Sequence, residues 1–325
     1  MAYQIRPSRP LDAEFRKVAI AQIDRALADL RREEGDIDAA IHEARKRFKK
    51  LRGLVRLIRP ADAELYAALN ASFREGAGGL SGARDKAALI EALGDLNRHF
   101  GEELSGDPLA SVRERLVAER DAASAKPEEI AGAVRRAIGA LEQARPLIEA
   151  FQLGGGKREI KRAGRVLGRG AGKTHGRARQ ALKRAEKSRE ADDLHELRKR
   201  VKYHWMHLRL LSPAWPEAFK PAVDLAKQIA DDLGRDHDYS VLRGEIRQEP
   251  AAFGDEATLS LLIALLDRRQ SELRETSLSA ARKLLAEESD AFERRIERLY
   301  RLAAQEGERD AAMPAETAEA ERRVA

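Results

Sequence analysis

The sequence predicts an all-α protein built from two copies of one helical unit around a pseudo-two-fold axis. Three observations predict this fold class. Leu, Ala, Arg, Glu and Lys dominate the 325 residues, of which 36% are charged and 5% are aromatic, a composition typical of helical proteins. Apolar residues recur at helical spacing along most of the chain, and no convincing alternating strand is present. A basic segment near the start recurs later at a constant offset.

Pro and Gly residues divide the helical pattern into segments. Helices are expected at 11–34, 37–58, 61–75, 83–104, 108–122, 127–151, 158–190, 192–211, 217–233, 238–248, 255–286 and 288–307. The glycines at 154–156 indicate a hinge, so residues 1–153 form the first repeat and residues 154–308 the second. Residues 309–325 are small and polar and are expected to form a flexible tail.

The composition excludes several classes of protein. The chain has no cysteine, which excludes disulfides and thiolate metal sites and fits a reducing cytoplasm. Its longest strongly apolar run, LSLLIALL at 259–266, is far shorter than the ~20 residues of a membrane span. The first residues lack the apolar segment of a signal peptide. We therefore expect a soluble, cytoplasmic protein with no cofactor, no metal and no membrane partner.

The repeat is the most informative feature of the sequence. IHEARKRFKKLRGLVRLIRP (41–60) and LHELRKRVKYHWMHLRLLSP (194–213) are identical at nine of twenty positions at an offset of 153. The same offset pairs Asp85 with Asp238 further along the chain. One offset over more than forty residues predicts two equivalent units with a shared face between them.

Each copy carries a stripe of positive charge on one face of a helix. In the first copy, steps of three and four residues connect His42, Arg45, Lys49, Arg52, Arg56 and Arg59. In the second copy, His195, Arg198, Lys202 and Arg209 keep the stripe, and Trp205 takes the place of Arg52. Glu43 and Glu196 are placed to pair with Arg47 and Arg200 at i+4, away from the stripe. The alternative interpretation is a solvated helix face that pairs with acids elsewhere.

A third basic segment precedes the second copy. Residues 157–189 contain thirteen Lys or Arg and two acids. If the two copies face each other, these segments would line one positive groove or tunnel. Converging cations attract a polyanion, and many similar positions along a stripe suit a long, multiply charged ligand better than a single phosphate.

The sequence gives no positive argument for catalysis. GRGAGKT (168–174) has its first glycine one position too late for a phosphate-binding loop, and HEARK and HELRK lack the second histidine of a zinc protease. His204 and His207 are three residues apart and could bind a metal, although ordinary packing is the simpler interpretation. We expect no catalytic residues and no metal ligands.

The duplicated H-E-x-R-K-R-x-K at 42–49 and 195–202, the basic helices and the L-x-x-x-x-D segments at 80–85 and 233–238 resemble the CHAD family, the conserved histidine α-helical domains. The resemblance covers residues 11 to 300 and implies two four-helix-type bundles related by pseudo-two-fold symmetry. It also implies a non-catalytic protein whose basic central channel binds inorganic polyphosphate, often at polyphosphate granules.

Carried onto this sequence, the resemblance implies a set of polyphosphate-binding residues on the two copies. They are His42, Arg45, Lys46, Lys49, Arg52 and Arg56 in the first copy and His195, Arg198, Lys199, Lys202 and Arg209 in the second. The basic run 157–189 matches a cationic helix of the family as a segment and not position by position, and it adds Arg165, Lys173 and Arg177 as further candidates. Trp205, in place of a first-copy arginine, departs from full symmetry of the contacts.

Two alternatives remain open. One is sequence-independent nucleic-acid binding, against which stands the scarcity of aromatic residues that could stack on bases. The other is a metal-dependent hydrolase of polyphosphate or triphosphate, for which Asp85 and Asp238 are the duplicated candidates. The polyphosphate hypothesis adds an expectation: with ordinary histidine pKa values near ~6.5, His42 and His195 would strengthen binding as the pH falls toward 6.

Overall fold

Eleven α-helices and two short 3₁₀ helices account for the regular structure of the residues that the computed structural model describes, which are 3–32, 36–80, 83–102, 107–124, 127–154 and 158–312; no strand occurs in them. The α-helices are α1 (Leu11–Leu30), α2 (Ile37–Ile58), α3 (Ala63–Gly78), α4 (Ala83–Phe100), α5 (Ala110–Ser124), α6 (Pro127–Glu149), α7 (Glu159–Ser188), α8 (Ala191–Leu211), α9 (Pro216–Gln248), α10 (Glu256–Leu284) and α11 (Ser289–Ala312). The 3₁₀ helices are η1 (Ser212–Ala214) and η2 (Pro250–Ala252). The all-α prediction is confirmed. Beyond Ala312, the expected tail lies outside the described residues.

One predicted helix break is wrong. The sequence pattern predicted separate helices at 217–233 and 238–248, but α9 runs unbroken from Pro216 to Gln248. Gly234 lies inside the helix, and the guanidinium of Arg198 on α8 packs against it, 3.2 Å from where a Cβ would stand. The glycine therefore serves a close contact between helices and does not end the helix.

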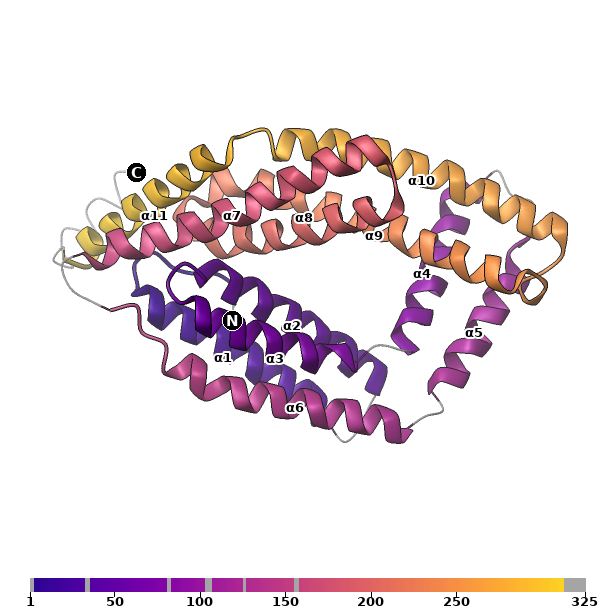
Figure 1. Cartoon of the computed structure of the whole chain (residues 1–325), viewed down its shortest axis with the longest axis horizontal. Coiled ribbons are helices and arrows are strands. Elements are labelled where there is room, and N and C mark those ends of the chain that lie inside the picture. The colour runs from indigo at the N-terminus through magenta and orange to yellow at the C-terminus, as the bar shows by residue number, and fades with distance from the viewer. Residues whose placement is uncertain are drawn as a thin grey trace, which may run out of the picture.

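The helices form two layers (Figure 1). In the first layer α1 packs on α2 and α6, and α3 packs on α2 and α6. In the second layer α7 packs on α8 and α11, and α8 packs on α9. The basic helices α2 and α8 hold the same place in the order of each half. One hydrophobic core runs through both layers and includes Phe15, Phe48, Leu167, Leu197 and Phe292.

Helices α4 and α5 leave the first layer and pack at the end of the molecule against α9 and α10 (Figure 1). They build a second hydrophobic core, which contains Leu93, Phe100, Leu116, Tyr239 and Leu262. Both halves of the chain therefore contribute to this end group, since its core contains residues of α4 and α5 and of α9 and α10.

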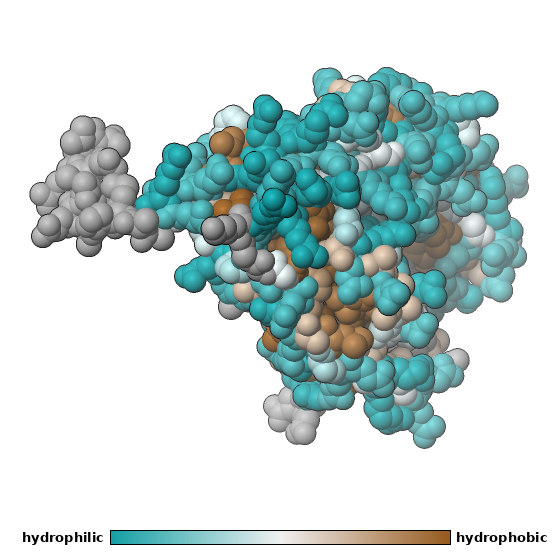
Figure 2. Space-filling view, turned by 60° about the vertical axis from the view of Figure 1, so that its left-hand side comes forward, coloured by the Kyte–Doolittle hydropathy of each residue, from teal (hydrophilic) through white to brown (hydrophobic). Residues whose placement is uncertain are grey.

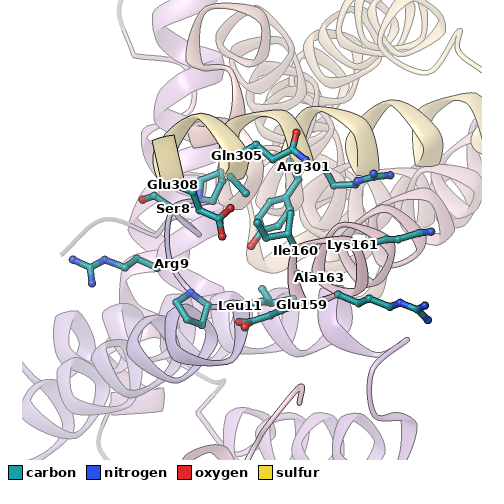
Figure 3. Close-up of a pocket in the computed structure, with 15 residues that line it drawn as sticks. Ser8, Arg9, Leu11, Glu159, Ile160, Lys161, Ala163, Arg301, Gln305 and Glu308 are labelled. Atoms are coloured by element: carbon teal, nitrogen blue, oxygen red, sulfur yellow. The ribbon is translucent and has the colours of Figure 1, made fainter. Parts of the chain in front are cut away.

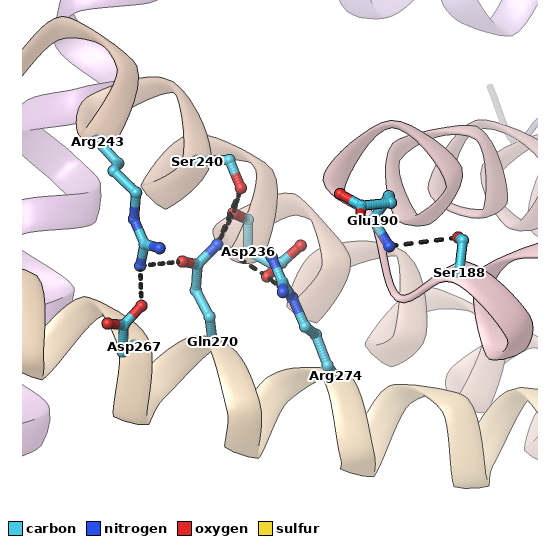
Figure 4. A network of polar contacts seen from close by, with 8 residues as sticks. All are labelled: Ser188, Glu190, Asp236, Ser240, Arg243, Asp267, Gln270 and Arg274. Atoms are coloured by element: carbon cyan, nitrogen blue, oxygen red, sulfur yellow. Dashed lines mark hydrogen bonds and ion pairs between the residues drawn. The ribbon is translucent and has the colours of Figure 1, made fainter. Parts of the chain in front are cut away.

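A buried polar network lies where α9 and α10 pass from one core to the other (Figure 4). The carboxylate of Asp236, which is 1% exposed, accepts hydrogen bonds from Arg274 Nε at 2.6 Å and Gln270 Nε2 at 3.0 Å. Gln270 also donates to the hydroxyl of Ser240 at 2.9 Å. A buried carboxylate needs such partners, so the network fixes the register between these two long helices.

The two layers meet where α2 crosses α7 and α8. A Cβ on Gly53 would stand 2.7 Å from Met206 Sδ, and a Cβ on Gly170 of α7 would stand 1.9 Å from the carbonyl oxygen of Leu57. His207 Nε2 donates to the carbonyl of Gly53 at 3.0 Å. Gly53 and Met206 occupy the same position in the two repeats, and contact between equivalent positions is what a two-fold axis produces. The pseudo-two-fold symmetry itself stays a prediction.

Figure 2 shows one face of the molecule, with the left-hand side of Figure 1 turned forward. Most of this face is hydrophilic, and hydrophobic residues show in a band through its lower middle part. A charged surface around an apolar interior fits the charge-rich sequence.

Candidate anion-binding site

The C-terminal half of the α2 stripe lies between α3 and α8. Arg52 Nε donates to Oδ1 of Asn70 on α3 at 3.3 Å. The guanidinium of Arg56 lies 4.3 Å from the ring centroid of Tyr203 on α8 and 5.7 Å from that of Tyr66 on α3. These cation–π contacts hold the stripe at the junction of the two layers.

A cavity of about 200 Å³ opens at the end of this stripe. Its lining residues, all from α2, α7 and the turn after α2, are Arg56, Arg59, Pro60, Arg169, Gly170, Lys173, Thr174 and Arg177. Five of these residues are cationic and none is acidic. Arg169 makes a long ion pair on its outer side, with its Nε 3.8 Å from Glu293 Oε1 on α11. We call this the cationic cavity.

Like charges crowd the cationic cavity. The charge of Arg59, followed by burial and the charge of Arg177, lowers the pKa of Lys173. Burial, followed by the charges of Arg200, Arg56 and Arg59, lowers the pKa of Arg177. Positive side chains of α2, α7 and α8 are therefore close enough to repel one another. A bound anion would relieve this repulsion.

Two arginines of α2 carry hydrogen-bond donors without partners. Nε of Arg56 and Nε of Arg47 are buried and have no hydrogen-bond acceptor among the described residues. A buried, unsatisfied donor is costly, and charged donors of this kind match phosphate oxygens well.

A second stripe of cations on α7 leads into the cationic cavity. Arg162, Arg165, Arg169, Lys173 and Arg177 follow one another at steps of three or four residues. All but Arg177 are exposed. At 1.5 Å per residue the stripe is ~22 Å long, which suits an extended ligand.

The second-copy residues are positioned by α9. Lys202 Nζ lies 3.4 Å from Asp231 Oδ1 and 4.7 Å from the ring centroid of Trp205. Arg209 lies 5.4 Å from the same centroid, so Trp205 replaces Arg52 with a ring that two cations cover. Arg198 rests on Gly234.

The expectation of an ordinary histidine pKa is wrong for His195. The His195 and His237 rings lie 3.9 Å apart, centroid to centroid. Burial, followed by the neighbouring charges of His237, Lys199 and Arg198, lowers the pKa of His195 to about 4. In the free protein His195 is therefore neutral at pH 6 and adds no positive charge to the site.

The remaining candidates lie nearer the starts of α2 and α8. Arg45 Nη1 donates to the carbonyl of Leu80 at 2.7 Å. Lys46 pairs with Glu43 at 2.6 Å, and Lys199 pairs with Glu196 at the same distance. His42 is half-buried and Lys49 is exposed.

The predicted i+4 pairs are confirmed. Glu43 lies 3.5 Å from Arg47, and Glu196 lies 2.5 Å from Arg200. Arg200 nevertheless reaches the neighbourhood of Arg177, which the sequence did not indicate.

Of the fourteen candidates, the structure brings Arg56, Lys173 and Arg177 together in one cavity. It adds Arg59 and Arg169, which were not among them. Both had a signal in the sequence, because Arg59 is the last step of the α2 stripe and Arg169 follows Arg165 by four residues. The close approach of α7 to α2 at Gly170 had no such signal.

A larger cavity of about 610 Å³ lies at the start of α7, against the residues before α1 and the end of α11 (Figure 3). Its lining carries both signs of charge, with Arg9 and Lys161 beside Glu159 and Glu308. Arg158 and Arg301 also line it, so cations outnumber acids by four to two, but the two acids distinguish it from the cationic cavity and make it less suited to a polyanion.

The histidine pair of α8 is a packing feature. His204 and His207 are buried, the His204 ring lies 5.0 Å from that of His175, and His207 binds the carbonyl of Gly53. In the described part of the chain, no group of three or more His, Cys, Asp or Glu could hold a metal ion. Asp238 is half-buried, and the side chain of Asp85 lies outside the described residues.

The fold and the site together define a helical protein with converging cations suited to an anionic ligand. The model of the CHAD domain matches residues 18–247, so the chain belongs to the CHAD family, as its sequence motifs suggested. The crystal structure of the CHAD domain from the plant Ricinus communis is similar in fold. It has a TM-score of 0.59 and 17% identity, and the match covers 88% of this chain and 95% of that one.

A search of curated proteins finds no match. Among the described residues, no helix is both long and apolar enough to cross a membrane.

Proposed function

We propose that this protein binds inorganic polyphosphate along the basic surface of α2, α7 and α8. The observation that carries the proposal is the cationic cavity, which five cations line without an acid. The stripe on α7 leads into it. Membership of the CHAD family, which is associated with polyphosphate binding, supports the same ligand.

The aromatic side chains favour polyphosphate over nucleic acid. Trp205 is covered by Lys202 and Arg209, and Arg56 lies over Tyr66 and Tyr203. Proteins that bind single strands stack bases on aromatic faces, and here the protein's own cations occupy these faces. A phosphate chain has no bases and needs only charged donors.

The proposal includes a binding role without catalysis, in the cytoplasm and at polyphosphate granules. Each cationic side chain of the site offers a positive charge to a phosphate oxygen, and none of these side chains is a nucleophile with a neighbouring base. Hydrolysis of the polymer in the presence of Mg²⁺ or Mn²⁺ would contradict this part of the proposal.

The test is a titration with long-chain polyphosphate and with single-stranded RNA of equal total charge, each at low and high salt. We expect tighter binding of polyphosphate, with an affinity that falls steeply as salt rises because counterions are released. Equal binding of the two polymers would indicate a generic cationic surface and would favour nucleic acid. Binding that does not depend on salt would contradict the electrostatic account.

A charge reversal in the cationic cavity locates the site. Arg177→Glu should weaken polyphosphate binding at low salt by ~10-fold or more, because it replaces a phosphate donor with a repelling charge. The control is Arg247→Glu, which makes the same change at an exposed position near the end of α9. Equal losses in both variants would place the ligand elsewhere.

A further inference from the structure

The larger cavity, at the start of α7, has walls that pack closely on one another. Its lining residues come from the chain before α1, from the first turns of α7 and from the last part of α11. A Cβ on Gly307 of α11 would stand 2.6 Å from Ser8 Cβ. A Cβ on Gly164 of α7 would stand 3.1 Å from the carbonyl oxygen of Glu297 on α11. These contacts hold the three segments together, so the cavity of about 610 Å³ is formed before any ligand arrives.

Tyr300 brings an unsatisfied hydroxyl to this cavity. The residue lines the cavity from α11 and is 2% exposed. Its hydroxyl makes no hydrogen bond among the described residues, and burial, followed by the charges of Glu159 and Glu14, raises its pKa. A buried hydroxyl without a partner is costly. This group therefore points to a bound molecule that supplies the missing hydrogen bond.

The two acids of the cavity are placed to receive a positive group. Figure 3 shows the carboxylates of Glu159 and Glu308 near the middle of the cavity. The charged ends of Arg9, Lys161 and Arg301 extend away from it. Neither acid forms an ion pair within the described part of the chain. Carboxylates and a hydroxyl oxygen together suit an ammonium group, which has three donors and no acceptor.

The start of α7 suits a negative group. Its first turn, residues 158–161, lines the cavity, and the side chain of the N-cap residue Arg158 makes no capping hydrogen bond. The first backbone hydrogen bond joins the N–H of Arg162 to the carbonyl of Arg158 at 2.9 Å, so the N–H groups before it have no partner within the helix. These N–H groups and the charges of Arg158 and Lys161 attract a carboxylate.

We propose that this cavity binds a small amino acid as a zwitterion. The ammonium group lies at Glu159, Glu308 and the hydroxyl of Tyr300, and the carboxylate lies at the start of α7. An anion alone would leave two acids unpaired, and a cation alone would lie among four positive side chains. The proposal does not depend on polyphosphate binding, because no residue lines both this cavity and the cationic cavity.

The test compares amino acids with molecules of the same length that carry one charge. The full chain is titrated by calorimetry at pH 7.5 with glycine, 4-aminobutanoate and 6-aminohexanoate, which cover a range of charge separations, and with the matching alkylamines and alkanoates. At least one amino acid should bind ~10-fold more tightly than either of its single-charge analogues, because it gains both charge-assisted contacts. The absence of this preference in all three series would overturn the proposal.

A pair of matched variants locates the ligand. Glu308→Gln should weaken binding of the preferred amino acid by ~10-fold without weakening that of its alkanoate, because only the ammonium group loses a contact. Glu306→Gln makes the same change at an exposed position of α11 outside the lining, and it should leave both affinities unchanged. Equal losses of amino acid binding in the two variants would rule out this cavity.

Tyr300→Phe tests the unsatisfied hydroxyl. The variant should bind the amino acid ~5-fold more weakly, while thermal unfolding of the free protein stays the same because no hydrogen bond within the protein is lost. Lower stability with unchanged binding would show that the hydroxyl is satisfied by the protein itself, and the role given to Tyr300 would then be wrong.

Discussion

At the scale of single residues, burial lowers the pKa values of several histidines below the ordinary value. His207 is fully buried, and burial lowers its pKa to about 3, although its hydrogen bond to Gly53 acts in the opposite direction. Burial also lowers the pKa values of His175 and His204. Of the three, His207 contacts the other layer through Gly53 on α2, and its ring is neutral there.

The buried histidines predict loss of stability in mild acid. Below pH 6.5 the unfolded chain takes up a proton at each of these histidines, while the folded protein does not until about pH 3 in the case of His207. The stability contributed by a neutral histidine is therefore complete above pH 6.5 and is lost as the pH falls. For His207 alone the loss at pH 5 is ~2 kcal/mol.

The measurement is the free energy of unfolding in urea at pH 7.5 and pH 5. His207→Gln should be less stable at pH 7.5 by ~1 kcal/mol, because it weakens the hydrogen bond to Gly53. It should also lose less stability on going to pH 5. An unchanged difference between the two pH values would show that His207 does not titrate as described.

At the scale of helices, one glycine decides how closely α7 approaches α2. Any side chain at Gly170 would collide with the backbone of Leu57, next to Arg56 and the cationic cavity. Gly139 on α6 is the opposite case, since nothing lies within 4 Å of a Cβ there.

The two glycines predict opposite effects of the same substitution. Gly170→Ala should destabilise the protein by ~1–3 kcal/mol through overpacking and should weaken polyphosphate binding by moving α7. Gly139→Ala should stabilise it by ~0.5–1 kcal/mol, because alanine favours the helix. Thermal unfolding and the polyphosphate titration measure both effects. A stable Gly170→Ala protein with normal binding would contradict this account of the α2–α7 contact.

The features that depend on local sequence pattern, such as helix bounds and the face that carries the cations, could be predicted from the sequence. Helix α2 was predicted with the bounds the structure gives, and its stripe led to Arg56 in the cavity. Contacts between distant helices were not predictable in this way. Helices α4 and α5 leave the first layer because their apolar faces pack against those of α9 and α10, which lie more than a hundred residues further along the chain. The low pKa of His195 depends first on burial and then on the charge of His237, which lies on another helix.

At the scale of the whole molecule, two hydrophobic cores separate the proposed site from the end group. Leu197 on α8 belongs to the core that runs through both layers, and Leu93 on α4 belongs to the core of the end group. Both are fully buried, so they form a matched pair for substitution.

Truncation of the two leucines should affect stability similarly but polyphosphate binding differently. Leu197→Ala and Leu93→Ala should each cost ~2–5 kcal/mol. Leu93→Ala should speed hydrogen exchange in α4, α5 and the second half of α9 while polyphosphate affinity stays within ~2-fold, because the end group opens on its own. Leu197→Ala should impair both stability and binding. Loss of binding in Leu93→Ala would mean that the two cores unfold as one unit.

The contact between Gly53 and Met206 has a consequence for how such a chain can arise. A homodimer of a single repeat would carry the same residue at both places: two glycines would leave a void, and two methionines would collide. Once both repeats belong to one polypeptide, each place can change independently, and a small residue can face a large one. If the predicted two-fold axis passes through this contact, joining the two repeats in one chain permits an asymmetric fit there that a pair of identical subunits would not allow.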